Sequence, residues 1–272
     1  MTVHAATSLT LDSPGGPGVG SAISSEFIKL TSVPRQRALL VGAIGAAVLM
    51  AAIFYVSLPV TQGRGLSELN PGEILSAGML GVDAAAFVLI ILAAIQVGSE
   101  YSTGMIQTTL IITPARGRVL VGKFVTIGAT SLAVGTLAAA VCVAAALVVA
   151  GALGIDPSLM LTGAGVRLAL GSIAMPVLYS VIAAAAAFVC RSTALGIAIP
   201  LAVMASGGLA GWFGDGVSGF LTPLMPVAAI HSLSGVATGH ESIGIAGATL
   251  SIIVWLGVSI GAAAWRLLRR DA

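Results

Sequence analysis

Long stretches without a charged side chain divide the sequence. Five of them cover residues 38–63, 124–155, 168–190, 192–214 and 242–265. A sixth stretch, 76–97, is interrupted only by Asp83. A helix of about 20 apolar residues crosses the hydrocarbon core of a bilayer, so the pattern predicts six transmembrane helices. Their approximate ranges are 38–58, 76–97, 125–151, 168–189, 193–211 and 243–264.

The length and continuity of these stretches favour helices over strands. Membrane-spanning strands are about 10 residues long and alternate in polarity, whereas here the apolar residues run without a break. Composition agrees, because 57% of the 272 residues are hydrophobic and only 8% are charged, against about 25% charged in soluble domains. The predicted fold class is therefore an all-α polytopic membrane protein, with a six-helix domain over 38–265.

The segments outside this domain are short. Residues 1–20 lack the basic and apolar regions of a secretory signal peptide and are expected to form a disordered tail. Residues 21–37 predict an amphipathic lead-in helix, with Ser24 or Ser25 as its N-cap. Residues 266–272 are expected to form a second tail.

The basic residues predict the orientation, because Lys and Arg in short connections stay on the cytoplasmic side. With both termini cytoplasmic, only Arg64 and Arg167 of the twelve basic residues lie outside. The other ten then lie inside, namely Lys29, Arg35, Arg37, Arg116, Arg118, Lys123, Arg191, Arg266, Arg269 and Arg270. This placement accounts for the net charge of +2, and nucleic acid is not an expected partner.

The outer connection from Trp212 to Glu241 is apolar but contains Pro223 and Pro226. It is too short and too interrupted for a further regular span, so it predicts an interfacial or re-entrant hairpin.

Asp83 is the only ionisable residue well inside a predicted span. A charge there costs about 2.5–3.5 kcal/mol on insertion scales, which marks it as an intramembrane polar site for a proton or a substrate. The other interpretation places Asp83 near the outer interface, solvated or paired with a residue such as Arg167.

Two short motifs suggest chemistry and fail on inspection. Residues 117–123 (GRVLVGK) have the spacing of a phosphate-binding loop, but Phe124 stands where Ser or Thr must hold magnesium. Residues 216–219 (GVSG) match a serine-protease motif, but Ser218 shares one outer loop with both nearby histidines and has no rigidly held base. We therefore expect no enzyme activity, no metal site and no cofactor in this chain.

The connection from Gly98 to Lys123 is the most informative polar segment. Apolar residues recur through it, which predicts a short helix beneath the membrane that offers them to a partner. Pro114 ends this helix, and Arg116, Arg118 and Lys123 are expected to contact lipid headgroups.

The lead-in 21–37 and the connection 98–123, both predicted to be cytoplasmic, resemble the corresponding segments of the permease subunits of bacterial ABC-2-type transporters, particularly the actinobacterial ones. The resemblance covers the chain from about Ser21 onward. The residues that carry it in the lead-in are Glu26, Phe27, Lys29 and Leu30. Those in the connection are Glu100, Tyr101, Gly104, Leu110, Pro114, Arg116, Arg118 and Lys123.

The resemblance implies a multi-pass exporter subunit in the bacterial plasma (inner) membrane. It would pair with a second copy or a paralogue and with separate ATPase subunits, which would bind ATP and magnesium. The coupling helix would contact the ATPase through Glu100, Tyr101, Gly104, Met105, Gln107, Thr108 and Leu110. The segment near 220–234 would correspond to a re-entrant gate. The alternative is an ATP-independent secondary transporter or channel that uses Asp83.

Overall fold

The computed structural model describes residues 18–65, 68–112, 115–210, 212 and 214–269. The predicted tail 1–20 therefore lies almost wholly outside the described residues, as do the last three residues of the predicted tail 266–272. The side chain of Leu110 is also outside the described part.

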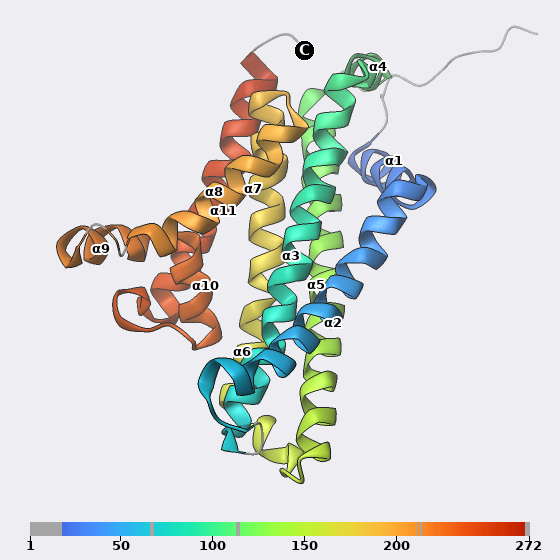
Figure 1. Ribbon diagram of the computed structural model, residues 1–272. Helices are drawn as coiled ribbons and strands as arrows, with labels where there is room; N and C mark the ends of the chain where they lie inside the picture. The colour runs from blue at the N-terminus through green and yellow to red at the C-terminus, as the bar shows by residue number, and fades with distance from the viewer. Residues whose placement is uncertain (1–17, 66–67, 113–114, 211, 213, 270–272) are drawn as a thin grey trace, which may run out of the picture.

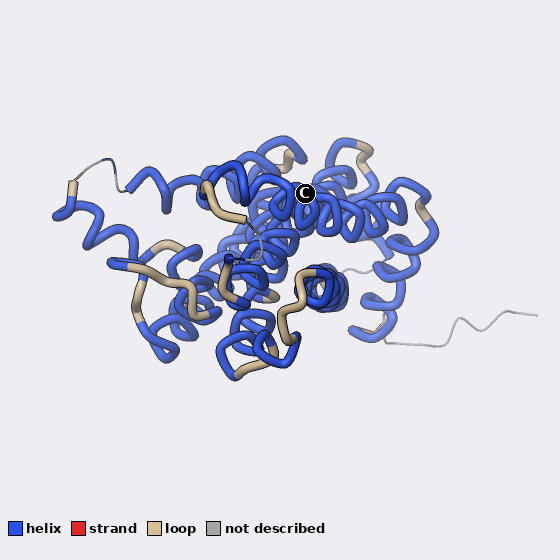
Figure 2. The backbone as a smooth tube through the Cα atoms, turned by 60° about the horizontal axis from the view of Figure 1, so that its bottom comes forward, coloured by secondary structure: helices blue, strands red, loops and turns tan. Residues whose placement is uncertain are grey.

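Helices make up nearly all of the described chain, which contains no strand (Figure 1; Figure 2). The predicted all-α class is confirmed. The elements are α1 (Val19–Ser32), α2 (Pro34–Gln62), α3 (Pro71–Ser102), α4 (Met105–Ile112), α5 (Arg116–Ala152), η2 (Pro157–Met160), α6 (Gly163–Ser172), α7 (Ala174–Cys190), α8 (Thr193–Ala210), α9 (Asp215–Leu221), η4 (Thr222–Leu224), α10 (Pro226–Ser234), η5 (Gly239–Glu241) and α11 (Gly244–Arg269).

Five apolar helical segments of the described chain are long enough to cross a membrane. They are α2, α3, α5, the nearly continuous pair α6 and α7, and α11. The predicted fifth span, 193–211, corresponds to α8, whose 18 residues give about 27 Å of helix at 1.5 Å per residue. A bent pair, 216–224 and 226–234, with a bend of 75°, raises the number of spans to six if it is counted as one. The chain is therefore a multi-pass membrane protein with five or six apolar helices able to span.

Local sequence explains where these helices start and stop. Pro71 opens α3 at a position where its missing N–H is not needed, and Asn70 and Glu73 form a reciprocal capping box in front of it. Gly63 ends α2 with a φ of 63°, in the left-handed region that glycine enters without strain. The corresponding end of α7 is Arg191, a non-glycine residue with a φ of 53°.

The helices form a central, mostly buried group and a peripheral group, whose members surround it as outer helices. In the hydrophobic stretch of α3 67% of the residues are buried, and in that of α6 and α7 72% are buried. The corresponding shares are 22% in α2, 28% in α5 and 11% in α11. Because the exposed residues of these outer helices are largely apolar, their outward faces suit lipid rather than water.

Close helix contacts in the core occur at small residues. A Cβ atom on Gly81 would collide with the carbonyl of Ala47 and the Sγ of Cys142. A Cβ atom on Gly98 would collide with the backbone of Thr193 at the start of α8. These glycines let α3 approach α2, α5 and α8 closely, which is how membrane helices gain packing energy.

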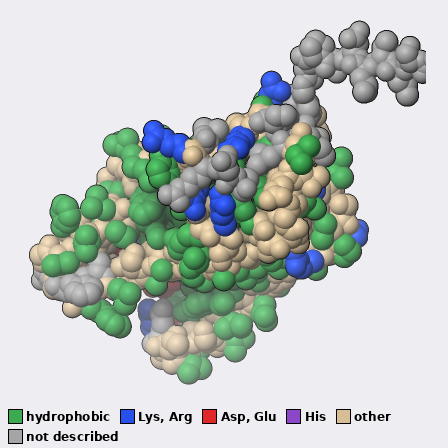
Figure 3. All heavy atoms as spheres, turned by 90° about the horizontal axis from the view of Figure 1, so that it is seen from above, with side chains coloured by type: hydrophobic (Ala, Val, Ile, Leu, Met, Phe, Trp, Pro, Cys, Tyr) green, Lys and Arg blue, Asp and Glu red, His purple; other side chains and the backbone are tan. Residues whose placement is uncertain are grey.

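Lys and Arg side chains gather on the face that Figure 3 shows from above, which is the upper end of the bundle in Figure 1. We call it the basic end; it comprises α1, the start of α2, α4, the start of α5, the turn between α7 and α8, and the end of α11. The opposite end holds η2 and the connection between α2 and α3; we call it the outer end, after the orientation that the basic residues predict.

Candidate functional site

Four charged side chains form a closed ring at the basic end. Lys123 of α5 lies 2.9 Å from Glu26 Oε2 and 2.7 Å from Glu100 Oε1. Lys29 lies 2.6 Å from Glu26 Oε1 and 2.9 Å from the same Oε1 atom of Glu100. The ring joins α1, the end of α3 and the start of α5, and its two acids and two bases balance in charge. We call these four residues the charge ring.

The charge ring is mostly removed from solvent. Lys123 is 1% exposed, and Glu26 and Glu100 are also buried. Burial alone would raise the pKa of Glu26, but the charges and hydrogen bonds of Lys123 and Lys29 outweigh it and hold that pKa below its ordinary value. For Lys29 burial acts to lower the pKa, and the two glutamates raise it above its ordinary value. Both shifts keep the groups ionised at neutral pH.

Small and apolar residues bring α1 to its place beside α5. A Cβ atom on Gly122 would stand 3.2 Å from Ala22, so the two helices touch there. Leu30 anchors the same helix in the core with 2% exposure. Glu26 and Lys29 lie one turn apart and share the face that points at Lys123, as expected for an i, i+3 pair.

An aromatic cluster lies beside the charge ring. Tyr101 meets Phe188 edge to face with ring centroids 6.3 Å apart, and Phe124 stacks on Phe188 at 5.8 Å. The guanidinium of Arg191 lies 5.8 Å from the centroid of the Tyr101 ring. These contacts tie the ends of α3, α5 and α7 together.

Beyond this anchored base, α4 stands at the surface (Figure 1). Ile106 is 3% exposed and holds the helix against the bundle, whereas Met105 is 47% and Ile111 78% exposed. Gln107 and Thr108 are exposed as well. Gly104, with a φ of 72°, forms the turn that separates α4 from α3. The helix thus presents a small surface of mixed apolar and amide or hydroxyl groups.

The structure corrects two predicted roles at this end. Lys123 was expected to contact headgroups, but it is buried in the charge ring, 97 residues away in sequence from one of its partners. Glu100 was expected to contact a partner directly, but it is 4% exposed and bound to both lysines. Arg116, in contrast, is half-buried and donates to the carbonyl of Leu267 near the end of α11, 3.1 Å away.

The stretch 117–123, which has phosphate-loop spacing, lies within the first turns of α5. A phosphate-binding loop needs free backbone N–H groups in a non-helical turn. Here the backbone is helical and Lys123 already binds two carboxylates, so the segment serves the charge ring.

A cavity of about 750 Å³ lies in the outer half of the bundle, between α2, α3, the junction of α6 and α7, and α10. Its polar lining residues are Ser57, Thr61, Asn70, Glu73, Ser76, Asp83, Ser172, His231 and Ser234. Its apolar lining includes Phe54, Leu58, Met79, Leu80, Leu168, Met175, Ile230 and Val236. Asp83, the predicted intramembrane site, and His231 and Ser234, from the predicted outer connection, thus line one cavity.

Asp83 does not pair with Arg167, the partner suggested as one alternative. Arg167 donates instead to the carbonyls of Ser232 and Leu233 at the end of α10. His231, also on the cavity wall, lies with its Nδ1 2.8 Å from Glu241 Oε2. Arg167 therefore holds α10 against α6, and Asp83 remains facing the cavity.

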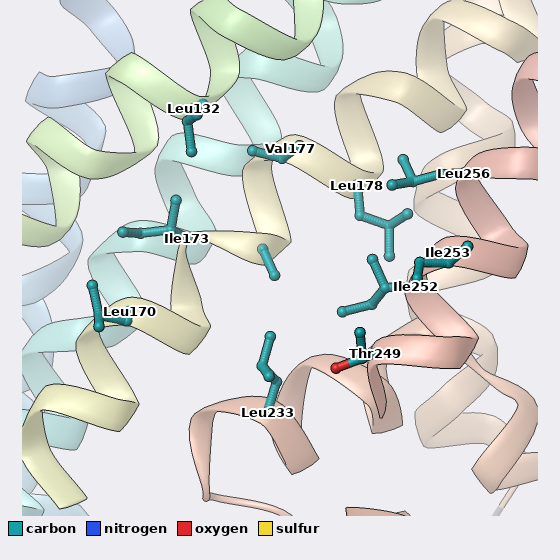
Figure 4. A pocket seen from close by; sticks show the side chains of 11 residues that line it. Leu132, Leu170, Ile173, Val177, Leu178, Leu233, Thr249, Ile252, Ile253 and Leu256 are labelled. Carbon is teal, nitrogen blue, oxygen red and sulfur yellow. The ribbon is translucent and has the colours of Figure 1, made fainter. Parts of the chain in front are cut away.

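A second hollow of about 400 Å³ is lined almost entirely by hydrocarbon (Figure 4). Leu170 and Ile173 face Leu233 of α10 and Ile252 of α11 across it. Its single polar side chain is Thr249, whose hydroxyl already donates a hydrogen bond to the carbonyl of Ile245. It offers apolar contact but no group that could orient a polar ligand.

Sequence reasoning named all four members of the charge ring but missed that they bind one another, and it missed the outer cavity. The available signal was the appearance of both signs of charge at the ends of apolar runs, where isolated charges are costly.

Comparison with known proteins finds neither a family model nor a curated relative that matches the chain.

Proposed function

We propose that this chain is the membrane-spanning permease subunit of an ABC-2-type exporter. It forms a translocation path with a second copy or a paralogue, and a separate ATPase subunit drives transport by hydrolysing ATP with magnesium. The basic end faces the cytoplasm of a bacterial cell, and the bent pair of α9 and α10 acts as the re-entrant outer element.

The observation that carries the proposal is the way in which α4 is attached to the rest of the bundle. Its exposed residues stand on a base in which α1, α3, α5 and α7 are joined by ion pairs and aromatic contacts. A force applied to α4 by a moving partner would pass to α3 and α5 because α4 lies between these two helices in the chain, only a few residues from each. Rigid coupling of this kind suits a rigid-body switch between two states.

In this proposal five of the predicted coupling residues divide into two groups. Met105, Gln107 and Thr108 contact the ATPase, because they are exposed. Glu100 and Tyr101 act as positioning residues behind that surface, since they are engaged by Lys123 and Phe188.

The test uses the purified chain together with an ATP-binding cassette ATPase from the same cell. Met105→Arg combined with Ile111→Arg places two charges on the exposed face of α4. We expect this variant to fold, to lose co-purification of the ATPase and to lose its stimulation of ATP hydrolysis. Leu159→Arg is the matched control, because Leu159 is an exposed apolar residue in η2 at the outer end.

Normal stimulation by the double variant would refute the proposed docking surface. Failure of the unmodified chain to associate with any ATP-binding cassette ATPase would refute the proposal as a whole.

One observation favours the ATP-independent alternative, namely that Asp83 lines a cavity between α2, α3 and α10. A secondary transporter would show ion-coupled flux in proteoliposomes that contain this chain alone. That flux would disappear in Asp83→Asn, whereas the exporter proposal predicts no flux without ATPase subunits.

A further inference from the structure

We propose that the outer cavity binds an organic cation with an apolar body, and that the carboxylate of Asp83 binds its positive charge. The site does not depend on the proposed export function, because a cavity of this chain alone would bind the ligand whether or not an ATPase is present.

The first argument is the arrangement of polar groups along α3. Glu73, Ser76, Leu80 and Asp83 are spaced by three, four and three residues and all line the cavity, so they share one face of the helix. At 1.5 Å per residue, Asp83 lies about 18 Å along α3 from its outer start. The face thus leads from a polar mouth at Glu73 to a carboxylate deep in the cavity.

The second argument is the charge balance of the cavity wall. Glu73 lies 3.7 Å from Arg64, and its other oxygen accepts the N–H of Asn70 at 2.9 Å. His231 Nδ1 lies 2.8 Å from Glu241 Oε2. Asp83 differs, because among the described residues it takes part in no ion pair or hydrogen bond. Of the two carboxylates on the cavity wall, that of Asp83 is therefore the one without an ion-pair partner among the described residues.

The third argument concerns what kind of cation fits. A metal ion such as calcium takes six to eight oxygen ligands, and the described residues contain no group of three or more metal-binding side chains. The volume of about 750 Å³ falls within the range of small-molecule sites. Phe54, Met79, Met175 and Ile230 supply apolar and polarisable walls, which suit a hydrocarbon or aromatic body attached to the charge.

The experiment uses the full chain in dodecyl maltoside and a fluorescent primary amine, dansylcadaverine. Its N-acetylated form carries the same fluorophore without the positive charge. Titration of the protein into each dye gives the two dissociation constants. We expect saturable binding of the amine and at least about tenfold weaker binding of the acetylated dye, a factor that corresponds to about 1.4 kcal/mol.

Asp83→Asn should weaken binding of the amine by at least about tenfold, because it removes the charge and keeps the shape. Asp156→Asn is the matched control, since it makes the same substitution at an exposed position in the turn before η2 and should leave the affinity unchanged. Equal affinity for the two dyes, or unchanged affinity in Asp83→Asn, would overturn the proposal.

A second variant covers the case in which Asp83→Asn does not elute as a folded protein. Ser76→Phe keeps Asp83 and fills the cavity from the same face of α3, so it should abolish binding of the amine. Retained binding in this variant would place the dye elsewhere and overturn the site.

The positive charge could belong to a lipid headgroup or to a free solute. Added phosphatidylethanolamine, which carries an ammonium group, is compared with phosphatidylglycerol, which does not. Displacement of the dye by phosphatidylethanolamine alone supports a lipid ammonium as the ligand, and saturable binding without displacement by either lipid supports a free cation. Equal displacement by both lipids would show that hydrocarbon rather than charge is recognised, and would overturn the proposal.

Discussion

Charged side chains lie inside the basic end of this bundle and on the wall of the cavity in its outer half, and their surroundings differ. At the basic end, Lys123 is held between Glu26 and Glu100, and Lys29 closes the ring. In the outer half, Asp83 faces a cavity without an ion-pair partner among the described residues. A closed ring fixes helices relative to one another, whereas an unpaired charge in a cavity is available to a ligand. The comparison suggests a rigid joint at one end and a receptor at the other.

The largest expected effect comes from opening the ring. Lys123→Met leaves the two buried carboxylates with Lys29 as the one remaining cation of the charge ring. Removing one partner of a buried ion pair costs about 3–5 kcal/mol. We expect a large drop in the thermal unfolding temperature in detergent. Arg37→Met is the control, because Arg37 is an exposed basic residue near the same end. A similar drop in unfolding temperature in both variants would show that the charge ring stabilises the fold no more than an exposed basic residue does.

In the outer half, removing a charge should raise the stability of the protein instead of lowering it. Asp83→Asn removes a charge that is expensive inside a membrane and that has no ion pair to lose, so it should stabilise the unliganded protein by roughly 1–3 kcal/mol. The measurement is the unfolding temperature without added ligand. A destabilised Asp83→Asn would reveal that the carboxylate has a structural partner, and would erase the contrast between the two ends.

The dependence of stability on acid pH tests whether Glu26 is stabilised in its ionised form by the charge ring. Because the pKa of Glu26 in the folded state is below its ordinary value of 4.5, its contribution is present above that value and is lost as the pH falls through the lowered pKa. Glu26→Gln should therefore be less stable than the unmodified protein at pH 7. The difference should shrink below about pH 4. Unfolding curves at several pH values measure it, and a pH-independent difference would contradict the assignment.

The smallest change in stability is expected on the wall of the outer cavity. His231 and Glu241 form a partly exposed pair, and such pairs contribute about 0–1 kcal/mol. His231→Gln should change the unfolding temperature by only a few degrees. A loss as large as that of Lys123→Met would mean that the pair is as important to the fold as the buried ring.

Much of the fold follows from the pattern of apolar residues. The charge-free intervals predict the long helices because a helix in lipid must satisfy its own backbone and expose apolar side chains. The helices extend beyond the predicted spans, however, with α3 reaching Ser102 and α5 starting at Arg116. Hydropathy marks the part of a helix in hydrocarbon and does not mark its polar ends.

The site is less predictable because its contacts are distant in sequence. The sequence predicts headgroup contacts for Lys123, as for Arg116 and Arg118, because these basic residues lie beside a predicted span. The partners of Lys123, Glu26 and Glu100, lie 97 and 23 residues away, and no local pattern reports such pairing. The outer cavity likewise requires α2, α3, α7 and α10 to meet, which the sequence of any single helix does not reveal.

The most direct test of the account is a photo-cross-link from the surface of α4. A photoreactive phenylalanine analogue at Thr108, which is exposed, should give an adduct with an ATP-binding cassette ATPase in intact cells. The same analogue at Leu159, at the outer end, should not. Absence of the Thr108 adduct, or an equal yield of ATPase adduct from Leu159, would contradict the claim that α4 is the ATPase docking element.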